Sequence, residues 1–333
     1  MTVDGRSGPP PVRRTISDMS TLLPGRVLGA LPSGPFRRSD ALRRGIPTRA
    51  LRELQRAGTL RQPLRGVLVP AACPDDVTVR ARAAQLALPE GAVACRGTAA
   101  WLLGVDARAP GDQDRPPDVE CAVPRGVTPA RRPGLRCYAV DLHPQDLTVL
   151  AGVTCTTATR TAVDLARWST PGMGLAVLDR MARLGLVVRE ELVEQVERWR
   201  GDPFVARARR LVGLLDARAE SFGESWLRLR LLDAGFPAPD LQISLRDDRG
   251  VERFRLDLGY VEHRWSCEYD GEAHHLGRAA EAADRARRAV IERVWGWSVV
   301  GVHKNLVLGP SMALERAVGE VLGREPAIRR RLW

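Results

Sequence analysis

The sequence is poor in lysine, histidine and aromatic residues. Only Lys304 among the 51 basic residues is a lysine, and there are 5 histidines. Arginine therefore carries the positive charge everywhere, which reflects the composition of the whole chain and not a choice of arginine for phosphate. No run of ~18 apolar residues occurs, and none of signal-peptide length follows Arg13 and Arg14, so we expect a cytoplasmic protein with no membrane partner.

The cysteines lack the spacing of a metal site. None of the six belongs to a CxxC pair, and histidine is too rare nearby to complete a structural zinc set. We therefore predict buried free thiols and no disulfides. Internal repeats are also absent, which excludes a repeat architecture.

The net charge of +11 suits a polyanionic partner and is unevenly distributed. Residues 1–70 hold 13 arginines against four acidic residues, and the rest of the chain adds only +2. The basic charge therefore lies at the N-terminal end. Residues 1–14, rich in Gly, Pro and Arg, are expected to form a disordered basic tail.

Residues 15–70 have the pattern of a small helical unit that ends in a hairpin. Ser39 or Asp40 is a candidate N-cap, Gly45 and Gly58 are candidate helix ends, and Pro70 closes the unit. The predicted elements are two helices, Ala41–Arg44 and Pro47–Arg56, and two strands, Leu60–Gln62 and Arg65–Val69, around a Pro63-Leu64 turn.

This order of elements is that of a winged helix. Arg49, Arg52 and Arg56 share one face of the second helix, while Arg61 and Arg65 lie on the predicted wing. A recognition helix in the major groove with a wing on the DNA backbone requires this layout. The alternative is a protein-docking module with a solvated basic face.

Residues 71–204 read as a mixed α/β middle region, and they contain no catalytic constellation. From 205 onward the pattern is that of a compact α/β unit, 205–333, with one long helix from Val205 to Leu232, interrupted near Ser221–Gly223 or continuous, and a later helix from Arg278 to Val294. Its predicted strands are Leu241–Leu245, Phe254–Tyr260, Trp265–Tyr269 and Trp297–His303.

The two strands in residues 253–270 carry the carboxylates. If they pair around Glu262-His263, Tyr260 opposes Trp265 and Asp257 falls opposite Glu268, with the apolar faces coinciding. Two carboxylates within ~5 Å repel each other, and Asp270 adds a third anion at the strand end. A divalent cation such as Mg²⁺ would make the arrangement favourable.

Other interpretations of these acids stay open. One carboxylate may be protonated, or may pair with Arg253 or Arg255. Glu224, on the preceding helix, is either a further ligand or an N-cap partner. His274 and His275 follow the strand as candidate general acids or bases, or as plain helix-start residues. Arg285 is a candidate phosphate contact, although solvated charge explains most of the arginines at 285, 287 and 288.

The segment around these residues resembles the Vsr-like (very-short-patch-repair) endonuclease domains, a branch of the PD-(D/E)XK nuclease superfamily. The matching residues are Glu224-Ser225, Asp257, Glu268-Tyr269-Asp270-Gly271, His274-His275, Asp284 and Gly296-Trp297. The resemblance implies an α/β sandwich with a mixed sheet, and Mg²⁺ or Mn²⁺ held by Asp257 and Glu268 for phosphodiester hydrolysis. The position of Asp270 at the strand end makes it the third predicted metal ligand. The usual superfamily lysine is replaced by Asp270, which moves the water-activating role toward His274 or His275.

The N-terminal two-thirds resembles proteins that begin with an AbiEi-type antitoxin winged helix. The matching segments are Ser39–Gly45, Arg49–Gly58, Leu64–Pro70, Ala99–Leu102 and Thr159–Ala166. That resemblance implies a promoter-binding repressor of a toxin–antitoxin pair, with a cognate toxin as a possible partner.

The fold class expected is therefore a multidomain α+β protein: a winged helix, an AbiEi-like α/β middle region and a nuclease-like α/β sandwich. The first functional reading is a DNA-binding, metal-dependent endonuclease of DNA repair or phage defence, without a small-molecule cofactor. The alternative is an antitoxin and transcriptional repressor with an inactive nuclease fold. RNA is a third possible substrate.

Overall fold

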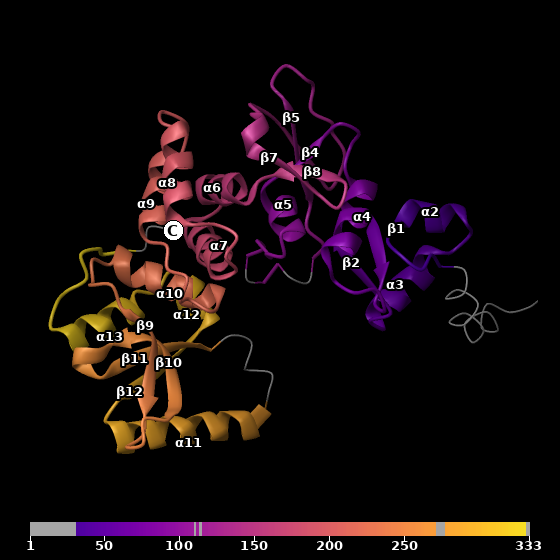
Figure 1. Ribbon diagram of the computed structural model, residues 1–333. Coiled ribbons are helices and arrows are strands. Elements are labelled where there is room, and N and C mark those ends of the chain that lie inside the picture. Colours follow the sequence, from indigo (N-terminus) through magenta and orange to yellow (C-terminus); the bar gives the residue numbers. More distant parts are fainter. Residues whose placement is uncertain (1–30, 110, 113–114, 271–276, 331–333) are drawn as a thin grey trace, which may run out of the picture.

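The computed structural model describes residues 31–109, 111–112, 115–270 and 277–330 (Figure 1). It is a mixed α/β protein with three separate sheets. The predicted tail, 1–14, and both candidate histidines, His274 and His275, lie outside the described residues. In the described part, no helix is long and apolar enough to cross a membrane.

The N-terminal unit contains the two predicted helices and two predicted strands, with shifted ends. Its elements are β1 (Phe36–Arg37), α2 (Arg38–Arg43), α3 (Thr48–Arg56), β2 (Leu60–Leu64) and β3 (Val67–Pro70), in a sheet of order β1-β3-β2. The turn lies at Arg65-Gly66 and not at Pro63-Leu64, because Gly66 supplies the positive φ of 84° that a tight turn needs. Helix α2 begins without a side-chain cap, so neither Ser39 nor Asp40 has the predicted capping role.

The middle part is a five-stranded sheet with helices beside it. The strands are β4 (Val93–Ala94), β5 (Val119–Pro124), β6 (Leu135–Val140), β7 (Leu147–Leu150) and β8 (Val153–Thr156), and their order in the sheet is β6-β5-β4-β8-β7. Helix α4 (Val77–Ala87) precedes β4 in the sequence, and α5 (Arg96–Leu102) follows it. Four helices follow: α6 (Ala158–Trp168), α7 (Pro171–Arg183), α8 (Arg189–Arg198) and α9 (Val205–Gly213). The short strands β4 and β7 were not predicted, because neither shows a recognisable alternation over enough residues.

The C-terminal part is a four-stranded mixed sheet of order β12-β11-β10-β9. Its elements are α10 (Phe222–Asp233), β9 (Asp240–Arg246), β10 (Glu252–Tyr260), β11 (Trp265–Asp270), α11 (Gly277–Trp295), β12 (Ser298–His303), α12 (Lys304–Leu308) and α13 (Ala313–Leu322). Figure 1 shows α10 and α11 on opposite sides of this sheet. The predicted long helix from Val205 is two helices, α9 and α10, separated by residues 214–221.

The predicted strand register is confirmed. Tyr260 pairs with Trp265 and Leu258 with Cys267, and the same register places Asp257 opposite Glu268. The connection is a 3₁₀ turn, Val261–His263, closed by Arg264 in the left-handed region at φ 46°. All six cysteines are free thiols, as predicted.

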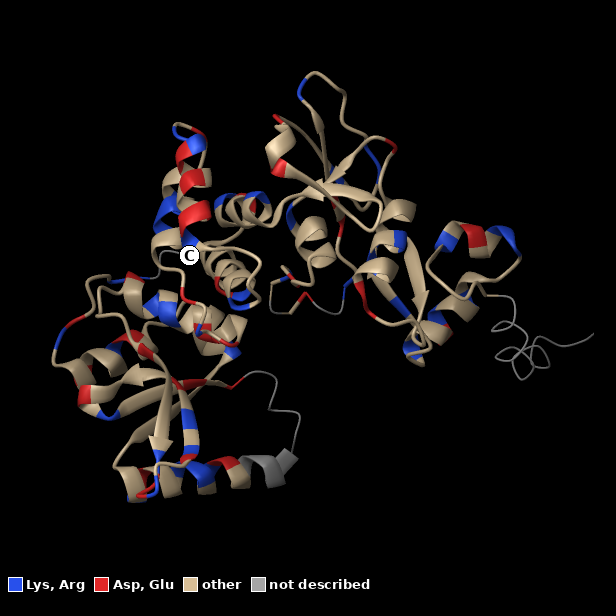
Figure 2. Ribbon diagram, in the orientation of Figure 1, with Lys and Arg blue, Asp and Glu red and all other residues tan. Residues whose placement is uncertain are grey.

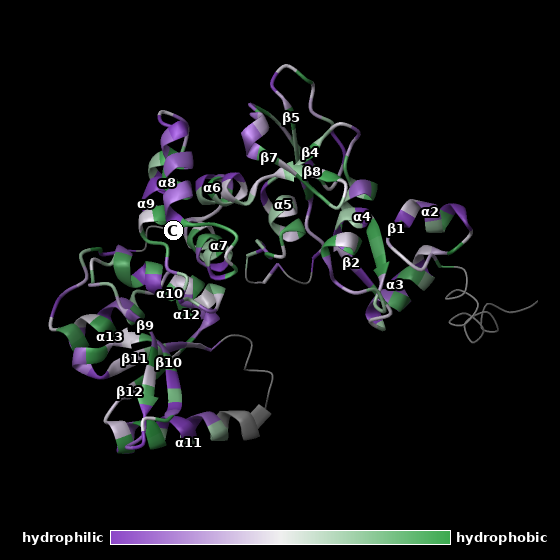
Figure 3. Cartoon of the chain, viewed as in Figure 1, coloured by the Kyte–Doolittle hydropathy of each residue, from purple (hydrophilic) through white to green (hydrophobic). Residues whose placement is uncertain are grey.

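A single hydrophobic core joins the middle helices to the C-terminal sheet. It includes Leu175 and Leu178 of α7, Leu227 of α10, Leu258 of β10 and Cys267 of β11, all buried. Hydrophilic residues dominate the outer helix α8 (Figure 3). The helices after β8 and the C-terminal sheet therefore bury their apolar faces against each other.

Two buried ion pairs fix α10 within this core. Arg230 donates to Glu315 of α13 through Nε at 2.7 Å, and to the carbonyl oxygens of Val307 and Ser311; both side chains of the ion pair are 1% exposed. Arg228 donates to Asp179 of α7 at 2.7 Å. Charged groups are buried only when paired in this way.

We expect Arg230→Met to lower the free energy of unfolding by about 3–5 kcal/mol, because Glu315 would stay buried without a partner. Denaturant unfolding followed by circular dichroism measures the change. Arg209→Met is the control, since its pair with Glu197 is exposed on both sides and is expected to contribute less than about 1 kcal/mol. Equal losses in the two variants would contradict a structural role for the buried pair.

Candidate functional site

Helix α3 presents the predicted row of arginines to solvent. Its buried residues are Ala50, Leu51 and Leu54, so the opposite face is free. Arg49, Arg52 and Arg56 are all exposed on that face. Arg49 pairs with Glu53 at 2.8 Å, but both are exposed, so the pair contributes little and does not block a phosphate. Figure 2 shows basic residues along α2 and α3.

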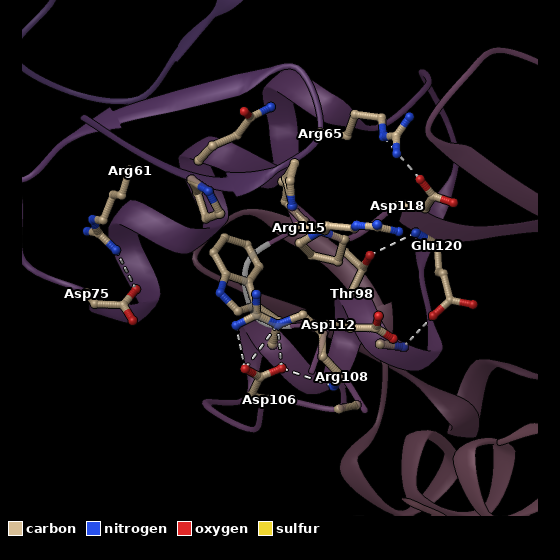
Figure 4. Close-up of a pocket in the computed structure, with 18 of the residues that line it drawn as sticks. Arg61, Arg65, Asp75, Thr98, Asp106, Arg108, Asp112, Arg115, Asp118 and Glu120 are labelled. Atoms are coloured by element: carbon tan, nitrogen blue, oxygen red, sulfur yellow. Dashed lines mark hydrogen bonds and ion pairs between the residues drawn. The ribbon is translucent and has the colours of Figure 1, made fainter. Parts of the chain in front are cut away.

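The two predicted wing arginines contact other residues of the protein, Arg61 as a partly buried side chain and Arg65 as an exposed one. Arg61 donates to the carbonyl oxygens of Cys73 and Pro74 at 3.0 and 2.9 Å, and it pairs with Asp75 at 3.1 Å. Arg65 lies 3.2 Å from Asp118 of the middle part (Figure 4).

The β2–β3 turn is therefore docked onto the middle part. The Arg65 backbone N–H donates to the Pro117 carbonyl at 3.1 Å, and the Arg65 side chain passes so close to Gly134 that a Cβ at 134 would collide with it. A cavity of about 820 Å³ lies beside this contact, between the N-terminal unit and the middle sheet (Figure 4). The sequence could not show this contact, because it joins residues more than fifty positions apart.

The second candidate site is a group of three carboxylates, Glu224 of α10, Asp257 of β10 and Glu268 of β11. Burial, and then the charges of Glu224 and Glu268, raise the pKa of Asp257 to about 7. Burial likewise raises the pKa of Glu224. The structure therefore brings these three of the predicted residues together.

Local packing explains how Glu224 reaches the strands. Ser221 caps α10 by accepting the Glu224 backbone N–H at 3.2 Å, and Glu224 Oε2 accepts from the backbone N–H of Glu220 and from Gln242 Nε2, each at 2.9 Å. The Tyr269 ring lies against Gly223, where a Cβ would be only 2.0 Å from it. Glu224 is therefore a capping partner that also lies close to Asp257, and its role as a metal ligand stays a prediction.

Arginines of α11 neutralise the other carboxylates. Arg287 holds both oxygens of Glu268 in a bidentate pair at 2.7 and 2.8 Å, and Arg288 reaches Asp270 at 3.1 Å and Asp284 at 2.8 Å. The expectation that these arginines are mostly solvated is wrong for Arg287 and Arg288, which are partly buried in these pairs. Arg285 is exposed on the same helix.

Asp270 forms an ion pair with Arg288 and is not part of the carboxylate group of Glu224, Asp257 and Glu268. Its carboxylate lies over Gly301 of β12, where a Cβ would meet Oδ2 at 2.0 Å. Arg253 and Arg255, considered as partners for the strand carboxylates, pair instead with Asp247 and Glu252. In the described residues, no group of three or more acidic, histidine or cysteine side chains has the geometry to hold a metal ion.

The comparisons with known proteins agree with the N-terminal and middle geometry. Residues 33–71 match the family described as "Transcriptional regulator, AbiEi antitoxin", and residues 92–214 match "AbiEi antitoxin C-terminal domain". The chain is thus a multidomain α/β protein built on AbiEi antitoxin domains. Both matches end before the three carboxylates Glu224, Asp257 and Glu268.

The chain is also 32% identical over 233 residues to two Mycobacterium tuberculosis proteins, "Uncharacterized protein MT2308" of strain CDC 1551 / Oshkosh and "Uncharacterized protein Rv2248" of strain ATCC 25618 / H37Rv. The similarity covers 70% of this chain and 82% of each relative. The chain belongs to the same family as these proteins.

The raised pKa of Asp257 predicts a pH dependence that Asp257→Asn removes. From about pH 4 to about pH 7, folded wild type keeps a proton on Asp257 that the unfolded chain has released, so the contribution of this group to stability falls as pH rises. Asparagine does not ionise. We expect the variant to gain stability relative to wild type from pH about 4 to pH about 8, measured by denaturant unfolding.

Asp248→Asn, which removes an exposed carboxylate from the β9–β10 turn, is the control for loss of one acid. If the free energy of unfolding changed with pH in the same way in wild type and Asp257→Asn, the pKa of Asp257 would be the same in the folded and unfolded states. That result would contradict the prediction.

Proposed function

We propose that the protein is an AbiEi-type antitoxin and transcriptional repressor that binds DNA through its N-terminal unit. The observation that carries this proposal is the exposed row of Arg49, Arg52 and Arg56 on α3, within the residues that match the transcriptional-regulator family. A basic helix face of this kind supplies phosphate contacts and base contacts in the major groove.

The unit would act as a winged helix, with α3 as the recognition helix and β2–β3 as the wing. The three-stranded order β1-β3-β2 beside two helices supports this assignment. Because Arg61 donates to the carbonyl oxygens of Cys73 and Pro74, and the β2–β3 turn is docked onto the middle part at Pro117, the DNA contact is assigned to α3 and not to the wing tip. A cognate toxin is proposed as the protein partner, on the basis of the antitoxin domain matched by residues 92–214.

Arg52→Ala is expected to weaken binding to duplex DNA and to reduce the slope of log K against log salt concentration by about 1, if one phosphate contact is lost. Fluorescence anisotropy with a duplex from upstream of the protein's own gene, and with a random duplex, measures both. Arg209→Ala, an exposed arginine on α9, is the matched control. Unchanged affinity and slope in Arg52→Ala would refute α3 as the DNA-contacting helix.

A second candidate function is metal-dependent phosphodiester hydrolysis by the C-terminal part. The observation that favours it is the raised pKa of Asp257 between Glu224 and Glu268, because a bound cation would relieve this crowding of buried carboxylates. Asp257 and Glu268 would hold Mg²⁺ or Mn²⁺, which would lower the pKa of a water molecule and stabilise the phosphate. Arg287 would have to release Glu268 for this to occur.

For this candidate, wild type is expected to nick plasmid DNA with Mg²⁺ or Mn²⁺, and Asp257→Ala is expected to lose that activity. Gel electrophoresis of supercoiled plasmid measures it, and Asp248→Ala controls for loss of one exposed acid. No cleavage by wild type with either metal, in a preparation that binds DNA, would reject the nuclease function and leave the repressor function standing.

A further inference from the structure

A second cavity lies in the middle part, away from α3 and from the carboxylates near Asp257. Its volume of about 650 Å³ is within the range of small-molecule sites. It opens between strands β5 and β6 and helices α6 and α8. Its charged and aromatic lining residues are Arg96, Arg125, Arg160, Arg167, Asp141, Asp164, Asp202, Tyr138, Trp168 and Trp199.

Three of the four arginines are already paired. Arg160 is buried and donates to Asp146 and Asp164, each at 2.8 Å. Arg167 donates to the Pro203 carbonyl at 3.1 Å and to Asp202 at 3.3 Å. The exposed Arg125 pairs with Asp141 at 2.9 Å on the solvent side. These pairs form a rigid frame around the cavity.

Arg96 differs from the other three. Its guanidinium lies 3.8 Å from the centre of the Tyr138 ring and 4.9 Å from that of Trp168, and it makes no hydrogen bond or ion pair with any described residue. The two rings hold the cation in place by cation–π contact. Its planar fork of N–H donors is therefore positioned in the cavity without a protein acceptor.

The backbone at Arg96 is strained. Its φ of 45° is in the left-handed region, which a residue with a long side chain rarely adopts. Strain of this kind persists only where the surrounding structure imposes it, and it concentrates at binding and catalytic sites. Here it directs the first residue of α5 toward Tyr138.

The electrostatics of the cavity favour an anion. Three of the lining arginines are paired with aspartates, whereas the Arg96 guanidinium has no hydrogen-bond acceptor among the described residues. Asp164 is held by Arg160 at 2.8 Å, so its charge is already offset within the protein. Trp199 adds a buried indole N–H that has no acceptor among the described residues, and its ring lies 4.3 Å from the Arg160 guanidinium.

We propose that this cavity binds a small organic phosphate, with the Arg96 guanidinium as the group that contacts the phosphate. The planar guanidinium matches two phosphate oxygens at once. A volume of about 650 Å³, larger than a phosphate alone requires, leaves room for an organic group, and the ligand we propose is a nucleoside monophosphate. This site goes beyond DNA binding and does not depend on it.

The test is titration of the full-length protein with AMP, ribose 5-phosphate, adenosine and inorganic phosphate, by calorimetry and by tryptophan fluorescence, since Trp168 and Trp199 line the cavity. Arg96→Asn is the key variant, because asparagine tolerates a left-handed backbone. Wild type is expected to bind AMP, and Arg96→Asn to bind it roughly 10- to 100-fold more weakly, as loss of a charged hydrogen bond predicts.

Arg183→Asn, an exposed arginine on α7, should bind AMP as wild type does. Binding of ribose 5-phosphate as tight as that of AMP would assign recognition to the phosphate alone, which keeps the site but removes the role of the base. No binding of any phosphate at millimolar concentration, or equal affinity of wild type and a folded Arg96→Asn, would overturn the proposal. The thermal unfolding transition of Arg96→Asn shows whether it is folded.

Discussion

Helix α10 is held from two directions by buried arginines, and the packing of α7 and α13 around it depends on these pairs. Arg228 reaches Asp179 on α7, and Arg230 reaches Glu315 on α13. Because a buried charge without its partner is strongly unfavourable, these pairs admit only one placement of α10 relative to both neighbours. The helices of the antitoxin domain and the C-terminal sheet are thereby packed into one core.

The same placement creates the carboxylate group. Ser221 and Glu224 begin α10 as a capping pair, and the fixed axis of the helix carries Glu224 toward Asp257. Arg287 from α11 then offsets the charge of Glu268. Asp257 is thus left with a raised pKa while the charge of its neighbour Glu268 is offset.

Arginine has three distinct physical roles in this chain. On α3, Arg49, Arg52 and Arg56 are solvated and available to a polyanion. In the core, Arg228 and Arg230 are buried in ion pairs, and at the β2–β3 turn Arg65 joins the N-terminal unit to Asp118. In the middle cavity, the Arg96 guanidinium lies against the rings of Tyr138 and Trp168. Because nearly every basic residue is arginine, residue type does not separate these roles, and only burial and partners do.

The sequence by itself determined the local structure: the helices and strands longer than a few residues, the Tyr260–Trp265 register and the exposed face of α3. Periodicity, glycine positions and capping residues act over short stretches, so they are readable without a structure. The docking of Arg65, the pairing of Arg287 with Glu268 and the cavity around Arg96 were decided by tertiary structure. Each joins residues far apart in the chain, and the identity of a charged residue does not say which distant partner packing will bring to it.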